Sequence, residues 1–146
     1  MSYNLKKEGK FNYVEIGEGR PIIILHGLMG GLSNFDGVAE FFSKNGYMVV
    51  LPELPLYSMS LLNTNVKSFS NYLNDFIEYK GYEDVILVGN SLGGHVGLYH
   101  TKLFPEKVKA LVITGSSGLY ESAMGSGYTK RSDYEVMKAK AQEVFY

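Results

Sequence analysis

The sequence predicts an α/β fold with a doubly wound, mostly parallel sheet. Residues 21–25 and 85–88 are apolar runs without polar alternation, which is typical of strands covered on both faces. Between them lie segments whose apolar residues recur at helical spacing. Strands that alternate with helices form parallel sheets with right-handed crossovers, so this alternation indicates the fold class.

Turn and cap residues divide the chain into its expected elements. Strands are predicted where β-rich apolar runs are bounded by glycine or proline, and helices where apolar residues follow helical spacing between caps. The first elements are an edge strand at residues 9–16 with a turn at 17–19, a central strand at 22–25, a helix capped by Ser33 or Asn34 and ending near 45–46, and a strand at 47–51 closed by Pro52. A loop at 53–62 precedes a helix at 66–80 with Gly81 at its C′ position, a strand at 85–88, a helix that begins at Leu92 and stops before Pro105, and a buried strand at 108–114.

Composition and charge narrow the classes of function. The 146 residues are expected to form one domain, and 45% hydrophobic and 20% charged residues are ordinary values for a soluble globular protein. A net charge of −1 with scattered basic residues favours neither a nucleic-acid partner nor a membrane surface. No segment has the pattern of a signal peptide or a membrane span, so a cytoplasmic protein is expected. With no cysteine and three scattered histidines, the sequence predicts no disulfide, no metal site and no cofactor.

The segment Gly89-Asn90-Ser91-Leu92-Gly93 carries the main chemical signal. It has the form Gly-x-Ser-x-Gly, which is weak on its own because it occurs by chance in many chains. Here it lies between a predicted strand and a predicted helix, the setting in which the motif becomes a nucleophile elbow. Such a turn strains the serine backbone and lifts the side chain clear, while the glycines let strand and helix approach. Ser91 is therefore predicted as a nucleophile, and the Leu92 N–H as an oxyanion donor.

A second motif, His26-Gly27, follows the central strand and opens a glycine-rich loop. The loop lacks the Gly-Lys-Ser/Thr of a phosphate-binding loop. Together with the elbow, it makes the chain resemble the N-terminal half of an α/β-hydrolase. The resemblance implies that the backbone N–H of Leu28 is the second oxyanion donor. It also implies that His26 is structural or shapes the substrate pocket.

The character of the chain changes after Gly118. Residues 1–118 are expected to form the N-terminal part of the core, and residues 119–146 the start of a helical cap. A capping box from Ser132 to Glu135 opens an amphipathic segment in this second part. In α/β-hydrolases a helical cap is commonly inserted after the sixth strand, which the resemblance places here.

The acid and the histidine of a catalytic triad are missing from the predicted site. In the family these residues follow the serine in chain order, and the only later histidines, His95 and His100, lie on the helix that starts at the elbow. The matching positions would fall in a C-terminal part that this sequence does not contain. We therefore expect the 146-residue chain to be inactive alone, to have an unpaired apolar edge at 108–114, and to need a complementary C-terminal fragment of the same protein.

Three functions remain open from the sequence. The leading one is a serine hydrolase of small carboxyl esters or related acyl substrates, with an acyl-enzyme formed on Ser91. A carbon–carbon bond hydrolase is the alternative, because Gly-Asn-Ser-x-Gly-Gly is similar to the motif of meta-cleavage-product hydrolases. Asn90 and Asn34 are then candidates to bind a substrate carboxylate or enol, although both also suit turn or cap hydrogen bonds. The third function is a non-catalytic ligand-binding protein on the same fold.

The loop after the second predicted parallel strand adds an expectation about the substrate. It is apolar and proline-rich where many relatives of the family have glycines. Leu54, Leu56 and Tyr57 are therefore expected to line the pocket and to favour an apolar acyl or alcohol group.

Overall fold

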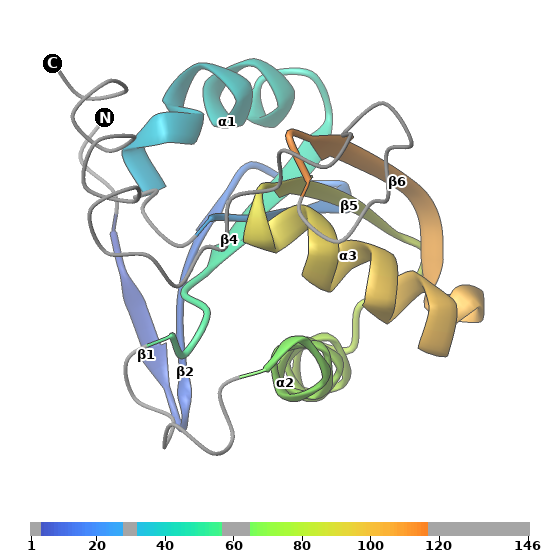
Figure 1. The fold of residues 1–146 in the computed structure, drawn as a ribbon. Coiled ribbons are helices and arrows are strands. Elements are labelled where there is room, and N and C mark those ends of the chain that lie inside the picture. The colour runs from blue at the N-terminus through green and yellow to red at the C-terminus, as the bar shows by residue number, and fades with distance from the viewer. Residues whose placement is uncertain (1–3, 28–31, 57–64, 117–146) are drawn as a thin grey trace, which may run out of the picture.

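A six-stranded sheet forms the centre of the molecule, with helices on both sides (Figure 1). The computed structural model describes residues 4–27, 32–56 and 65–116. The strand order is β1-β2-β4-β3-β5-β6, with parallel pairing from β4 to β6 and antiparallel pairing of β1 with β2 and of β2 with β4. The strands are β1 (Lys6–Glu8), β2 (Phe11–Ile16), β3 (Arg20–Leu25), β4 (Tyr47–Pro52), β5 (Val85–Asn90) and β6 (Val108–Thr114). The helices are α1 (Asp36–Ser43), α2 (Val66–Lys80) and α3 (Leu92–Leu103), with short 3₁₀ helices η1 (Leu32–Phe35) and η3 (Pro105–Lys107). The predicted α/β fold with a mostly parallel sheet is confirmed.

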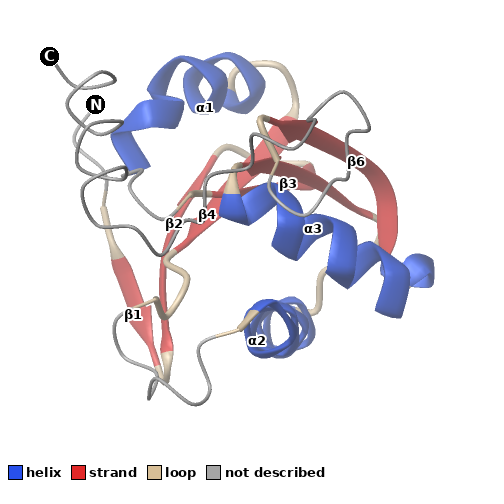
Figure 2. Cartoon of the chain, in the orientation of Figure 1, coloured by secondary structure: helices blue, strands red, loops and turns tan. Residues whose placement is uncertain are grey.

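Different helices cover the two faces of the sheet. Successive side chains of a strand point to opposite faces, so β3 contributes to both. Ile22 and Ile24 pack in one cluster with Ala39 of α1, whereas Ile23 and Leu25 pack in the larger cluster with α2 and α3. Figure 2 shows α1 on one side of the red strands and α2 and α3 on the other. Within the described residues, no helix combines the length and the apolar character needed to cross a membrane.

The first predicted strand is a hairpin, and the prediction of an edge strand was wrong. Gly9 has a φ of 58°, which turns the chain between β1 and β2. The strand β2 begins at Phe11 and lies between β1 and β4, so it has neighbours on both sides. The sequence of β1 is Lys-Lys-Glu, which carries no apolar alternation and gave no strand signal.

The helix α1 does not begin at the predicted cap. Ser33 and Asn34 lie in the 3₁₀ helix η1, and α1 follows with Phe35 at its N-cap position. No side-chain hydrogen bond caps that end, so the predicted capping role of Ser33 or Asn34 was wrong. The 3₁₀ turn ahead of the helix is a common way to enter an α-helix.

The helix α2 has the predicted length and a cap at each end. The Asn65 side chain accepts a hydrogen bond from the Ser68 N–H at 2.9 Å, which satisfies one of the unpaired donors of the first turn. Gly81 ends the helix in the left-handed conformation with a φ of 64°. Leu73, Phe76 and Ile77 are fully buried against the sheet.

The strand β6 has the predicted bounds, and the unpaired apolar edge expected at 108–114 is present in the described sheet; the prediction from its apolar pattern that the strand is buried was wrong. It is the last strand of the described sheet and pairs with β5 on one side. Val112 is 49% exposed, and the strand residues are half-buried or exposed. Its apolar residues gave the pattern of a buried strand because the pattern does not reveal which strand ends the described sheet.

A charged network fastens α2 to the hairpin. The Glu15 carboxylate accepts hydrogen bonds from Lys6 Nζ at 2.9 Å and from the Tyr82 hydroxyl at 2.6 Å. It also forms an ion pair with Lys80 at 3.0 Å, and Lys80 donates to the Tyr13 hydroxyl at 2.9 Å. Burial raises the pKa of Glu15, but the hydrogen bonds from Tyr82, Lys6 and Lys80 outweigh it and lower the pKa to about 2. The network therefore holds a fully ionised carboxylate between three elements.

Candidate active site

Ser91 lies in a strained turn between β5 and α3. Its backbone has φ 52° and ψ −116°, outside the regions that L-residues normally occupy. The residue is exposed, and α3 begins immediately after it at Leu92. The strand–turn–helix context expected around Ser91 is therefore present, with the strain that lifts the side chain clear of the sheet.

Two glycines make this turn sterically feasible. A Cβ on Gly89 would lie 2.5 Å from the carbonyl oxygen of Gly93, and a Cβ on Gly93 would overlap the carbonyl oxygen of Leu25. In both cases the obstacle is backbone, which cannot rotate away as a side chain can. Close approach of β3, β5 and α3 at this point therefore requires glycine at both positions.

The carboxyl end of β6 braces the turn. The Ser91 N–H donates a hydrogen bond to the Thr114 carbonyl oxygen at 3.0 Å. The side-chain amide of Asn90 donates to the same carbonyl at 3.2 Å and to Thr114 Oγ1 at 3.0 Å. Sequence reasoning missed Thr114, although its position at the end of a strand parallel to β5 was a usable signal.

The start of α3 supplies backbone donors next to Ser91. The first N–H groups of a helix have no intrahelical partner, and the helix dipole adds partial positive charge at this end. At the start of α3, the His95 N–H donates a helical hydrogen bond to the Ser91 carbonyl oxygen at 3.3 Å. The N–H of Leu92, in the first helical residue, is thus in the region where an oxyanion donor is expected.

The loop after β3 reaches the same point. A Cβ built on Gly27 would lie 3.1 Å from Ser91 Cβ and 3.5 Å from Asn90 Oδ1, so this loop touches the turn. The buried His26 fixes the loop: its Nε2 accepts from the Leu54 N–H at 3.1 Å, and its Nδ1 lies 2.9 Å from the Gly27 carbonyl oxygen. Since a carbonyl oxygen only accepts, Nδ1 carries the proton and Nε2 is the acceptor.

Two of the remaining predicted site residues fall outside the described part of the chain. Asn34 is exposed on η1. Leu28, the predicted second oxyanion donor, and Tyr57, a predicted pocket residue, fall outside the described residues, as does the predicted cap at 119–146. Leu54 and Leu56 are packed in the core cluster with α2, which accounts for their apolar character.

The rings of the other two histidines are not hydrogen-bonded to Ser91 in the described part of the chain. His95 is half-buried in α3. His100 is fully buried, and its Nδ1 lies 3.3 Å from the Ser70 carbonyl oxygen on α2. Burial lowers the pKa of His100, which keeps the ring neutral at pH 7. In the described part of the chain, no histidine ring forms a hydrogen bond with Ser91.

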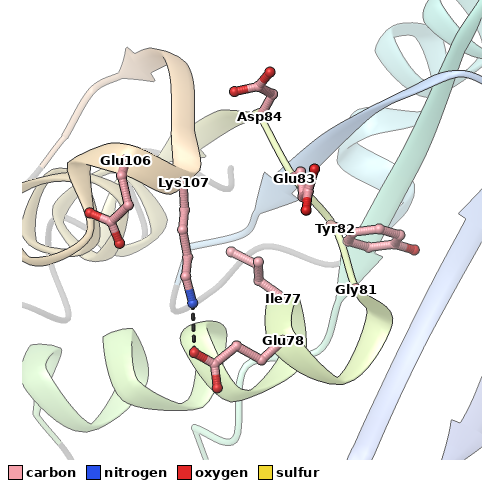
Figure 3. A pocket seen from close by; sticks show the side chains of 8 residues that line it. All are labelled: Ile77, Glu78, Gly81, Tyr82, Glu83, Asp84, Glu106 and Lys107. Carbon is pink, nitrogen blue, oxygen red and sulfur yellow. Dashed lines mark hydrogen bonds and ion pairs between the residues drawn. The ribbon is translucent and has the colours of Figure 1, made fainter.

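A surface hollow lies at the opposite end of the same strands. Figure 3 shows Lys107 reaching across it to Glu78, with the two side chains 2.6 Å apart. The hollow has a volume of about 430 Å³, and Asp84, the residue before β5, lines it. The six residues of β5 separate it from Ser91, a rise of about 20 Å. This hollow is therefore distinct from the candidate active site.

Comparison with known proteins defines the class. The family model for the alpha/beta hydrolase fold matches residues 20–136, which is most of the chain. The chain therefore belongs to the alpha/beta hydrolase fold family.

Particular relatives differ in the reactions that their names describe. The 2-hydroxy-6-oxononadienedioate/2-hydroxy-6-oxononatrienedioate hydrolase of Comamonas testosteroni is 35% identical, over 74% of this chain and 40% of that protein. Lipase 1 of Psychrobacter immobilis is 28% identical, over 84% of this chain and 40% of that protein. The solved structure of MGS-MChE2, an alpha/beta hydrolase enzyme from a sediment metagenome of the Mar Chica lagoon in Morocco, is 69% identical. That match has a TM-score of 0.77 and covers 81% of this chain and 54% of the other. The chain thus spans 40% of the length of these two curated relatives.

Proposed function

We propose that this chain carries the nucleophile of a serine hydrolase that acts on small carboxyl esters or related acyl substrates. The observation that carries the proposal is the exposed Ser91, held at φ 52° between β5 and α3. Backbone strain of this kind persists only where the surroundings enforce it, and it clusters at functional sites. Here Gly89, Gly93 and Thr114 enforce it.

In the proposed reaction, Ser91 Oγ attacks the carbonyl carbon of the ester and its proton passes to a histidine base. The backbone N–H groups of Leu92 and Leu28 hold the negative oxygen of the tetrahedral intermediate. The bond to the leaving alcohol then breaks, the alcohol takes the proton from the histidine, and an acyl group remains on Ser91. Water, deprotonated by the same base, attacks this acyl group, and Ser91 regains its proton as the acid leaves.

The base and its acidic partner are proposed to come from polypeptide that corresponds to the rest of the relatives. Two observations support placing the serine on this chain and the base and acid on another part. The chain spans 40% of the matched curated relatives, and the rings of His26 and His100 are engaged with backbone groups away from Ser91. Without a base the serine hydroxyl stays protonated at pH 7 and is a weak nucleophile. We therefore propose that the 146 residues are inactive until a complementary C-terminal part joins them.

A chimera tests the proposal. The matched part of this chain would replace the corresponding part of MGS-MChE2, with which it is 69% identical, and the product would be treated with a fluorophosphonate. Peptide mass spectrometry is expected to find the adduct on Ser91, with none in the Ser91→Ala chimera and little on the 146 residues alone. A folded chimera that takes no label at Ser91 would contradict the proposal. Ligand binding unchanged by Ser91→Ala, without turnover, would instead support a binding protein on this fold.

A carbon–carbon bond hydrolase is the second candidate, favoured by one relative and one residue. The Comamonas testosteroni enzyme, 35% identical, is named as a hydrolase of dienedioates, and Asn90 stands directly before Ser91 in this chain. The chimera would be compared on p-nitrophenyl butanoate and on a 2-hydroxy-6-oxo dienoate. Faster turnover of the dienoate would favour the second candidate, and faster turnover of the ester would favour the first.

A further inference from the structure

The orientation of the Asn90 side-chain amide indicates which chemical groups of a substrate the site can recognise. It lies at the carboxyl end of β5, where substrates of open α/β sheets bind, and directly before Ser91. An asparagine amide has one end that donates hydrogen bonds and one that accepts them. Which end faces the site decides which substrate groups the residue can recognise.

Thr114 fixes the orientation of this amide. The Asn90 nitrogen lies 3.2 Å from the Thr114 carbonyl oxygen and 3.0 Å from Thr114 Oγ1. A carbonyl oxygen has no hydrogen to give, so the amide end that faces it must be the NH₂ group. The two acceptors of Thr114 match the two N–H donors of the amide.

The amide oxygen consequently points the other way. In the sheet, β5 lies between β3 and β6, so a nitrogen directed at β6 leaves the oxygen directed toward β3. A Cβ built on Gly27, the second residue after β3, would lie 3.5 Å from Asn90 Oδ1 and 3.1 Å from Ser91 Cβ. The acceptor oxygen and the serine therefore border the same point of the loop.

We infer that Thr114 is a positioning residue that makes Asn90 present an acceptor, so that the site favours substrates with a hydroxyl donor near the reacting carbonyl and gains nothing from a carboxylate there. A carboxylate carries only acceptors and would face Asn90 Oδ1, another acceptor. This inference rests on the proposed ester hydrolase function and specifies its substrate class. Of the two substrate groups that Asn90 is a candidate to bind, it favours the enol, which is a hydroxyl donor, over the carboxylate.

The orientation is testable on the full 146-residue chain without any turnover. The side-chain NH₂ signals of Asn90 and the Ser91 amide would be followed by NMR in the wild type, Thr114→Val and Thr114→Ser. We expect slow hydrogen exchange in the wild type, exchange of the Asn90 NH₂ group about fivefold faster in Thr114→Val, and recovery in Thr114→Ser, which keeps the hydroxyl. Identical Asn90 exchange in all three proteins would show that the Thr114 side chain does not hold the amide, and would overturn the positioning role of Thr114.

The preference is tested with three esters of similar length: methyl butanoate, methyl 3-hydroxybutanoate and monomethyl succinate. In titrations of the same chain, the hydroxy ester should bind about fivefold more tightly than methyl butanoate, and the succinate no more tightly. Thr114→Val keeps the backbone carbonyl that faces the Asn90 amide but loses the Oγ1 acceptor. It should therefore weaken the hydroxyl preference, and Thr114→Ser should restore it, which a merely structural role would not do. Tightest binding of the succinate, or no binding of any ester, would overturn the proposal. Failure of the proposed hydrolase function would show differently, as an absence of labelling at Ser91 in the chimera with the NMR result intact.

Discussion

The two ends of β5 carry the same unusual φ angle but differ in their surroundings. Asp84, just before the strand, has a φ of 51°, and Ser91, just after it, has a φ of 52°. Asp84 borders an open hollow crossed by an ion pair between Lys107 and Glu78, and aspartate tolerates positive φ better than most residues. Ser91 combines its φ with a ψ of −116° and sits against glycines that have no room for a side chain. Positive φ alone therefore does not distinguish the two residues; the proposal for Ser91 rests on enforced strain at the start of a helix.

The largest expected effect separates the two ends by activity. In the chimera with MGS-MChE2, Ser91→Ala should lower kcat/KM for p-nitrophenyl butanoate at least about a thousandfold, because the nucleophile is lost. Asp84→Ala, at the other end of β5, should leave kcat/KM within about twofold, since it lies about 20 Å away. Steady-state kinetics of the two variants measure these changes. Equal losses of kcat/KM would contradict the assignment of the active site to the Ser91 end of β5.

The next effect tests whether the elbow is held by close backbone contact. Gly93→Ala should lower the free energy of unfolding by about 3 kcal/mol, because the new methyl group would overlap the Leu25 carbonyl oxygen. The matched control is Gly37→Ala in α1, where a Cβ meets nothing within 4 Å; it should stabilise the protein by up to about 1 kcal/mol. Urea unfolding of both variants measures the difference. A mild effect of Gly93→Ala would mean that the turn can relax.

A smaller effect concerns the charged network, whose groups are fully paired and hold the fold rather than a substrate. Glu15→Gln should lower the free energy of unfolding by about 1–2 kcal/mol at pH 7. The folded-state pKa of Glu15 is lowered from 4.5 to about 2, so its contribution is present above about pH 4.5 and is lost as the pH falls toward 2. Unfolding measured against pH should show this decline in the wild type and a weaker one in Glu15→Gln. The control is the exposed Glu83→Gln, which should keep the wild-type pH dependence.

The smallest expected effect is the difference in backbone strain between the two positive-φ residues, Ser91 and Asp84. Ser91→Gly and Asp84→Gly both add the same flexibility to the unfolded chain, so their difference reports the strain of the native residue. The free energy of unfolding of Ser91→Gly should exceed that of Asp84→Gly by about 1 kcal/mol. Equal stabilities would show that Ser91 is no more strained than Asp84.

Local sequence signals predicted the parallel part of the fold and the position of Ser91. The strand–turn–helix around Gly89 and Gly93 was predictable because each residue has a local reason to be there. The strand β1 was missed because its Lys-Lys-Glu sequence becomes a strand only through pairing with β2. The hydrogen bonds from Thr114 were missed because they depend on the register between β5 and β6; the sequence signal reached only as far as placing Thr114 at the end of a strand parallel to β5.

Trapping an acyl-enzyme on Ser91 is the most direct test of the proposed reaction. The chimera would be mixed with p-nitrophenyl butanoate, quenched in acid within the first turnover, and digested for mass spectrometry. One butanoyl group is expected on the peptide that contains Ser91, and none in Ser91→Ala. Rapid turnover without this adduct, or a butanoyl group on another residue, would contradict the proposed reaction.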